Sequence, residues 1–317
     1  MKTIFSFKKS ALVIALAVIS IATSCKKDED ELPVASDQNI VEIVVADSDF
    51  SLLEAAVKHA DLVATLSGTG PFTVFAPTNE AFTAAGLDTE AKINALPKET
   101  LRNILLYHVA GSSIAAAAIP EGSNTAVKSA SNIDLYVTKN NKGVYINGAT
   151  VTQADVMVTN GIIHVINKVL MPPSGNIVEV AQSNPDFSLL VAAVLRASEG
   201  QTNLANVLSG DGPFTVFAPT NQAFMDAGFA NVAAIQAADP ATLTSILTYH
   251  VVAGRIFSTD LVDNSTAATV NGSNVTTTLN GGAKVKGAKN TSAANISSAD
   301  VVTTNGVIHV IDQVLLP

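Results

Sequence analysis

The sequence repeats itself, and this repetition limits the fold more than any other feature of the chain. The segments DFSLL, GPFTVFAPTN and YHV begin at residues 49, 70 and 107 and return at residues 186, 212 and 249. A fourth segment, Asn-Gly-x-Ile-His-Val-Ile, begins at residue 160 and returns at residue 305, so the offset stays between 137 and 145 residues. Short solenoid repeats have units of about 20 to 50 residues. The pattern therefore predicts a duplicated domain and not a solenoid.

Two domains also fit the length and the composition of the chain. The chain has 317 residues, and one domain usually takes about 100 to 200. Hydrophobic residues make up 48% and charged residues 14%, so each half has enough apolar side chains for a core. We predict a first domain at residues 38–172, a linker at residues 173–175 and a second domain at residues 176–317.

Within each copy the pattern changes from helices to strands. Residues 40–58 and 96–109 carry apolar side chains at helical spacing, with a break at the Asp47-Ser48-Asp49 cluster, which is placed to cap a second helix. Residues 72–76 read as a buried strand that ends at Pro77, and Thr78 or Asn79 is placed to cap the next helix. From residue 127 to 171 apolar and polar residues alternate between turn signals, which predicts short antiparallel strands. Helices kept apart from such strands indicate an α+β domain.

Residues 1–25 are predicted to be a signal segment and not part of the fold. Three lysines precede an apolar run that is shorter than the ~20 residues of a membrane-spanning helix, and small residues lead into Cys25. Cys25 is the only cysteine, so no intramolecular disulfide can form. The segment resembles a bacterial lipoprotein signal, which would make Cys25 the site of lipid attachment and anchor the chain to a membrane. A plain signal peptide that contains a cysteine is the alternative.

Residues 26–37 are predicted to be an acidic tether between the anchor and the first domain. The charge run that opens this tether resembles the export signal of surface-exposed lipoproteins. We therefore expect an outer-membrane protein that is lipid-anchored and exposed at the cell surface, with the periplasmic face as the alternative. The formal net charge of −9 argues against nucleic acid as a partner, because that affinity comes from basic contacts to phosphate.

The repeated motifs resemble those of fasciclin (FAS1) domains. Residues 73–82 and 215–224 resemble the first signature of that family, the two Tyr-His pairs resemble its central motif, and residues 160–172 and 305–317 resemble its second signature. The resemblance covers nearly all of the chain after residue 37. It implies two tandem domains, each a β-sandwich or wedge of short antiparallel strands with helices packed over it. It also implies roles in adhesion and matrix binding, no cofactor and no common catalytic activity.

The histidines are the obvious candidates for metal binding or catalysis. Four of the five recur between the copies, and we expect them and the neighbouring tyrosines to form a structural motif: Tyr107, His108, His164, Tyr249, His250 and His309. A histidine in a strand shares a face with residues two positions away, which places His164 beside Ile162 and Ile166 in the core. The family's Tyr-His pair has been proposed as an integrin contact, but a buried pair could not touch a partner.

Catalytic and metal sites have no support in the sequence. A zinc site needs several converging His, Cys or carboxylate ligands, and the chain has no closely spaced His pair. The Gly-x-Ser-x-Gly nucleophile motif is missing from the sequence, and no carboxylate pair recurs in a suggestive setting. We therefore predict that the chain is not an enzyme and takes no cofactor or metal.

Tyr136 and Tyr145 form a candidate contact patch that only the first copy has. They flank the turn at residues 139–143, and the matching stretch of the second copy has neither tyrosine. On paired strands the two rings would share one face. Two interpretations stay open, namely ordinary cross-strand packing and an aromatic patch that contacts a ligand.

The leading functional hypothesis is a cell-surface adhesion module. Its partner would be an extracellular glycan or protein, and the module would recognise extracellular matrix, a polysaccharide or another cell. Many weak contacts would act together. The alternative hypothesis is an accessory lipoprotein of a surface glycan-uptake or envelope complex that binds a protein partner.

Overall fold

A computed structural model describes residues 36–200 and 202–317. The signal segment, Cys25 and nearly all of the acidic tether lie outside these described residues, so the predictions made for them stay predictions. Within the described residues, no helix combines the length and apolar character needed to cross a membrane.

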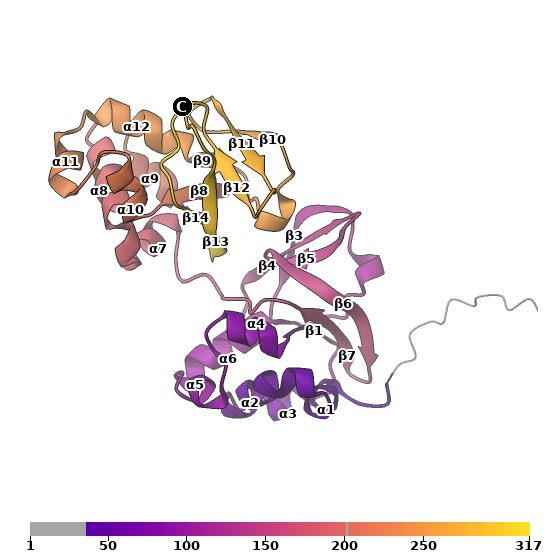
Figure 1. The fold of residues 1–317 in the computed structure, drawn as a ribbon. Coiled ribbons are helices and arrows are strands. Elements are labelled where there is room, and N and C mark those ends of the chain that lie inside the picture. Colours follow the sequence, from indigo (N-terminus) through magenta and orange to yellow (C-terminus); the bar gives the residue numbers. More distant parts are fainter. Residues whose placement is uncertain (1–35, 201) are drawn as a thin grey trace, which may run out of the picture. The chain divides into compact units, whose positions relative to one another are not determined.

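The first domain begins with helices and ends with strands (Figure 1). Its elements are α1 (Ile40–Ala46), η1 (Ser48–Phe50), α2 (Ser51–His59), α3 (Val63–Leu66), β1 (Phe72–Pro77), α4 (Asn79–Ala84), α5 (Glu90–Asn94), α6 (Lys98–Tyr107), β2 (Val109–Ala110), η2 (Ala116–Ala118), β3 (Gly122–Lys128), β4 (Asp134–Asn140), β5 (Gly143–Ile146), β6 (Ala149–Val158) and β7 (Gly161–Ile166).

The second domain repeats this order. Its elements are α7 (Ile177–Ser183), η3 (Pro185–Phe187), α8 (Ser188–Ala197), α9 (Leu204–Ser209), β8 (Phe214–Pro219), α10 (Asn221–Asp226), α11 (Val232–Ala237), α12 (Pro240–Tyr249), β9 (Val251–Ala253), η4 (Ser258–Asp260), β10 (Ser265–Ala268), β11 (Asn274–Thr278), β12 (Lys284–Lys286), β13 (Ala294–Thr303) and β14 (Gly306–Ile311).

The two domains have the same sheet topology, as the repeat predicts. The strand order is β2-β1-β7-β6-β5-β4-β3 in the first domain, and the order in the second is its counterpart, β9-β8-β14-β13-β12-β11-β10. The α+β fold of mostly antiparallel strands is confirmed. One pair differs from the prediction, because β1 and β7 are parallel, as are β8 and β14. Parallel strands need a long crossover, and here the helices α4 to α6 and the strand meander supply it.

A bulge in the longest strand folds the sheet into a wedge. The first residues of β6 pair with β5 and its later residues pair with β7, and the β6–β7 register shifts on either side of Gln153. Asp155 lies in the bulge with φ of 58°, and Asp300 lies in the matching bulge of β13 with φ of 64°. Such a bulge bends a strand, so the two halves of the sheet turn toward each other.

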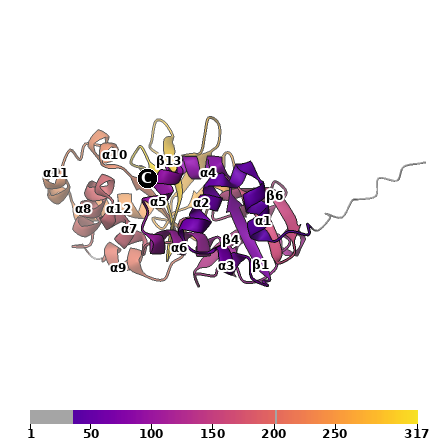
Figure 2. The same ribbon diagram turned by 90° about the horizontal axis from the view of Figure 1, so that it is seen from below.

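The central strands are buried on both faces by this arrangement. Val74 of β1 packs in the cluster under the helices, whereas Phe75 packs in a second cluster with Leu135 of β4 and Ile146 of β5. In Figure 1 the helices α1, α2 and α3 lie below β1, on the side away from β3, β4 and β5, and in Figure 2, seen from below, these helices overlap β1. Burial on both faces explains why β1 and β7 read as nearly continuous apolar runs.

The helix caps differ in part from the predicted ones. The side chain of Asp47 accepts a hydrogen bond from Asp49 N and so caps η1, not α2. The acceptor at the start of α2 comes from a distant residue, because Asn79 Oδ1 accepts from Leu52 N at 3.0 Å. Thr78, and not Asn79, caps α4. The signature sequence thus ties two helices to the end of β1.

Candidate ligand-contact site

The Tyr-His motif lies in the interior of both domains. Tyr107 is the last residue of α6, where its hydroxyl donates to the carbonyl of Asp134 at 3.0 Å and accepts from Asn147 Nδ2 at 2.8 Å. Tyr249 donates to the carbonyl of Asn274 at 2.6 Å and accepts from Ala288 N at 2.9 Å. Burial raises the pKa of Tyr107 to about 12. Neither hydroxyl is left free to contact a partner.

His108 is a neutral bridge between two backbone groups. Leu170 N donates to its Nε2 at 2.9 Å, so the ring proton must lie on Nδ1, which donates to the carbonyl of Ile104 at 2.8 Å. His250 makes the same two bonds, to Leu315 N at 2.8 Å and to the carbonyl of Ile246 at 2.8 Å. Burial lowers the pKa of both rings to about 4. Each ring ties the end of a helix to the chain that follows the last strand.

The strand histidines carry the opposite tautomer. His164 Nδ1 accepts from Asp155 N at 3.2 Å, so its Nε2 carries the proton that is donated to the carbonyl of Ile114 at 2.8 Å. His309 makes equivalent bonds of 3.3 Å to Asp300 N and 2.9 Å to the carbonyl of Ile256, and burial lowers its pKa. His164 also stacks on Phe75, with ring centroids 5.6 Å apart.

The bulge aspartates are site residues that the sequence reasoning missed. Asp155 Oδ1 accepts from Ala116 N at 2.8 Å, and Asp300 Oδ1 accepts from Ser258 N at 2.6 Å. Each carboxylate therefore holds a short 3₁₀ turn, while the amide of the same residue holds a histidine. Asp300 also pairs with Lys168 Nζ at 3.2 Å. The available signal was the recurrence of Ala-Asp-Val just before each Asn-Gly motif.

The asparagine of the second signature is a buried connector as well. Asn160 Oδ1 accepts from Ile40 N at 3.0 Å, and its Nδ2 donates to the carbonyls of Leu66 and Gly68, each at 2.8 Å. Asn305 makes the equivalent three bonds in the second domain. One side chain thus links the start of α1 and the end of α3 to the β6–β7 turn.

These side chains form no reactive centre. In each domain the two ring nitrogens of each recurring histidine are engaged by backbone groups, so none is free to take a proton from a substrate. In the part of the chain that the structure describes, no group of three or more His, Cys, Asp or Glu residues is placed to hold a metal ion.

The two tyrosines of the predicted contact patch share one sheet face but are not both open. In the β4–β5 register Tyr145 lies opposite Thr138, so Tyr136, two residues earlier, is its diagonal neighbour. Tyr145 is only 9% exposed. Tyr136 is half-buried, with the guanidinium of Arg255 3.8 Å from its ring centroid. The patch therefore offers one partly covered ring, and its role in ligand contact stays a prediction.

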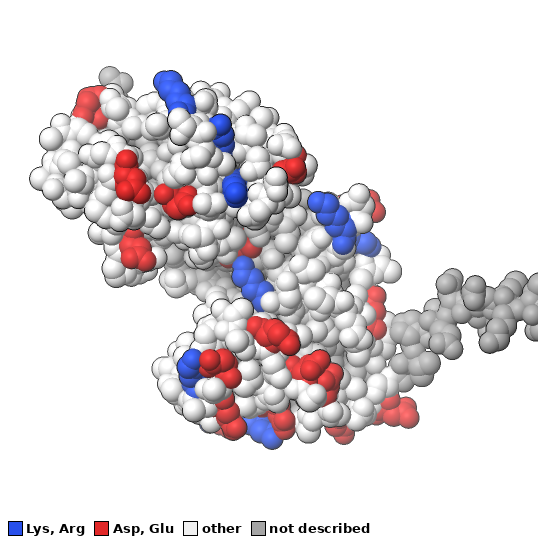
Figure 3. All heavy atoms as spheres, in the orientation of Figure 1, with Lys and Arg blue, Asp and Glu red and all other residues white. Residues whose placement is uncertain are grey.

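The surface carries no dominant charged area on the face that Figure 3 shows. Most of the visible side chains are uncharged, and the acidic and basic ones are scattered among them (Figure 3). This face therefore has no single strongly charged patch that would steer a partner electrostatically.

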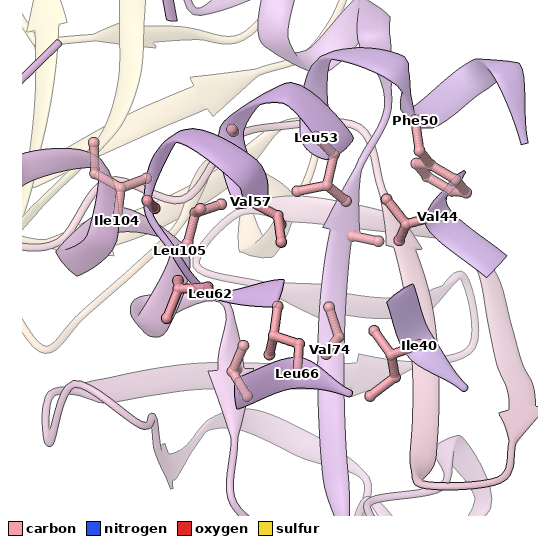
Figure 4. Close-up of a cluster of buried hydrophobic side chains, with 14 of the residues drawn as sticks. Ile40, Val44, Phe50, Leu53, Val57, Leu62, Leu66, Val74, Ile104 and Leu105 are labelled. Carbon is pink, nitrogen blue, oxygen red and sulfur yellow. The ribbon is translucent and has the colours of Figure 1, made fainter. Parts of the chain in front are cut away.

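Each domain has an apolar socket between its first three helices and the sheet. The first-domain socket has a volume of about 110 Å³, and its lining includes Ile40, Val44, Val57, Leu66, Val74 and Leu105. Figure 4 shows these side chains directed toward one another from α1, α2, α3, β1 and α6. The second-domain socket has a volume of about 40 Å³ at the equivalent residues.

The two sockets correspond position by position. Fifteen residues line each, they match one to one in the repeat, and ten are of the same type in both domains. Five positions differ, and three of these lie on α1 or α2 near the mouth: Val45 is replaced by Gln182, Glu54 by Val191 and Lys58 by Leu195. The other two differences shorten a side chain, because Val44 is replaced by Ala181 and Val63 by Ala205. Most of the inner wall is thus kept, while the mouth is changed.

Comparisons with known proteins agree with the repeated motifs. The model of the fasciclin domain matches residues 48–172 and 185–317. Transforming growth factor-beta-induced protein ig-h3 of Sus scrofa is 32% identical over 253 residues, which cover 80% of this chain and 35% of that protein. Protein sll1483 of Synechocystis is 45% identical over 139 residues, which cover 44% of this chain and 76% of that protein.

A solved structure and a third relative extend the comparison. Human periostin is 28% identical over 254 residues, which cover 80% of this chain and 29% of periostin. The chain thus spans about a third of the length of ig-h3 and periostin. The structure of a FAS1 domain pair from the insect cell adhesion molecule fasciclin I is 21% identical, with a TM-score of 0.41 over 87% of this chain and 96% of that one.

Proposed function

The chain belongs to the fasciclin domain family, and on this premise we propose that it is an adhesion module that binds extracellular partners through the surfaces of its two domains and carries out no reaction. The observation that carries the proposal is the internal use of the signature side chains. The recurring histidines, asparagines and bulge aspartates are engaged by backbone groups of their own domain. What is left for a partner is surface and not a reactive cleft.

The duplicated architecture supports adhesion by many weak contacts. Two linked domains convert the second binding event into an intramolecular one, and display of many chains on a surface multiplies this effect. The finer parts of the proposal are that Cys25 is acylated, that the tether displays the domains from an outer membrane, and that the partner is a matrix protein or a glycan.

A bead-binding experiment tests this proposal. Beads that carry the folded chain at graded density are added to surfaces coated with matrix proteins, with polysaccharides or with cells. We expect saturable capture that rises steeply with density, because avidity exceeds single-site affinity by about 100-fold or more. Protease or periodate treatment of the capturing surface then separates a protein partner from a glycan. Absence of capture on every surface at every density would contradict the proposal.

A further inference from the structure

We propose that the first-domain socket is a binding site for one compact apolar side chain, of leucine type, presented by a protein partner. This inference rests on the proposed function and deepens it, since it names the chemistry of the partner's anchor and the place where the anchor inserts. The second-domain socket is the matched comparison that the chain itself provides.

The interior of the socket selects an apolar group. Its walls are aliphatic or aromatic side chains, and the one polar side chain among the deeper lining residues, His108, has both ring nitrogens bonded to backbone. A water molecule needs about two to four polar partners to occupy a cavity, and an apolar cavity of similar size stays dry and accepts benzene or xenon. The deeper part of the socket therefore provides no hydrogen-bond partners for water, and its apolar walls can pack against a hydrocarbon group.

The size of the socket limits the ligand to one group. Sites for whole small molecules take about 300 to 1,000 Å³, whereas this socket measures about 110 Å³. A single branched aliphatic side chain suits that space. Insertion of one such anchor into a desolvated pocket is the usual arrangement at the energetic centre of a protein interface.

The mouth of the socket favours a polypeptide over a lipid tail. Glu54 and Lys58 form an ion pair at 2.5 Å on one side of the mouth, and Val45, 52% exposed, lies at its α1 edge. A side chain in a polypeptide arrives with backbone N–H and C=O groups beside it, which the carboxylate can accept from and the ammonium can donate to. A hydrocarbon tail brings no such groups. In the second domain Val191 and Leu195 replace this pair.

Methyl NMR of the full chain tests the proposal directly. The probe is N-acetyl-leucinamide, the polar control is N-acetyl-glutaminamide, and benzene reports the bare cavity. We expect the leucine probe to shift the methyl signals of Val44, Val57 and Leu66 saturably, with at least about a fivefold smaller shift at Val194 and Leu208 in the second domain, whose socket is smaller. The glutamine probe is expected to shift neither set.

Three outcomes would overturn the proposal: no saturable shift at the first-domain socket, a response to benzene without one to the leucine probe, or equal responses in both domains. Val57→Phe fills the first-domain socket and is expected to abolish the shift, while Val194→Phe, its counterpart, leaves the first-domain shift unchanged. If Val57→Phe does not fold, the wild-type comparison of the two probes still decides. If the beads are captured but the leucine probe does not bind, only this inference is contradicted. If the probe binds but the beads are not captured, only the proposed function is contradicted.

Discussion

Acidification from about pH 8 to about pH 5 is expected to lower the free energy of unfolding by about 2 kcal/mol in each domain. The cause is His108 in the first domain and His250 in the second, whose pKa is about 4 in the folded chain. An unfolded histidine has a pKa of about 6.5, so in this range the unfolded state binds a proton that the folded state does not. Stability is therefore fully present above the unfolded pKa and is lost as the pH falls toward the folded one.

The first domain gives the cleaner test of this prediction. Hydrogen bonds lower the pKa of some carboxylates, such as Asp61 and Asp88. Their contribution to stability is lost only when the pH falls below the ordinary carboxylate pKa, which lies under the tested range. In the second domain two further groups contribute: burial lowers the pKa of His309, which adds to the loss on acidification, and burial raises the pKa of Asp260, which acts in the opposite direction. Urea unfolding followed by NMR resolves the two domains. A first-domain unfolding free energy that is unchanged between the two pH values would contradict the account of His108.

Replacing Gly161 with alanine is expected to destabilise the first domain by about 3 kcal/mol. Gly161 opens β7 and pairs with Phe72 of β1, and an added Cβ would lie 2.0 Å from the carbonyl oxygen of Phe72 and 2.8 Å from its carbonyl carbon. Both clashing atoms belong to the backbone of the central parallel pair, so neither can move without loosening the ladder. Urea unfolding measures the loss.

Gly111→Ala is the matched control for this change. Nothing lies within 4 Å of a Cβ at that position, so its effect is expected to stay within about 0.5 kcal/mol. The equivalent of Gly161 in the second domain is Gly306, whose added Cβ would also meet a backbone oxygen, that of Phe214, at 2.0 Å. A loss below about 1 kcal/mol for Gly161→Ala would show that the central pair is not held as closely as described.

The local and repeated features of the fold could be predicted from the sequence. Helical spacing, turn signals and the recurrence of four motifs predicted two like domains with helices before strands, and the common strand order and the family match confirm this. The parallel pairing of β1 with β7 could not be predicted, because the two strands are about ninety residues apart and their periodicity holds no information on partner or direction. The remote capping of α2 by Asn79 was missed for the same reason.

The contact geometry around the motifs is less accessible to sequence reasoning. The pattern around His164 indicates an apolar strand face, but the tautomer depends on which distant backbone groups face the ring, here Asp155 N and the carbonyl of Ile114. The socket leaves no local signal either, since an unfilled space depends on how α1, α2, α3 and α6 pack on one sheet. The sequence does show that Glu54 and Lys58 of the first domain are replaced by Val191 and Leu195 in the second. Only the structure shows that these positions line the two sockets.

The protonation states of the four recurring histidines test the central claim most directly, because the claim is that their rings hold backbone segments together and do no chemistry. Long-range ¹H–¹⁵N correlation spectra report which ring nitrogen carries the proton. Between about pH 8 and about pH 5 the account predicts neutral rings for His108 and His250 with the proton on Nδ1, and at neutral pH the proton on Nε2 in His164 and His309. A charged ring at His108 or His250 near pH 6, or the opposite tautomer in either pair, would contradict it.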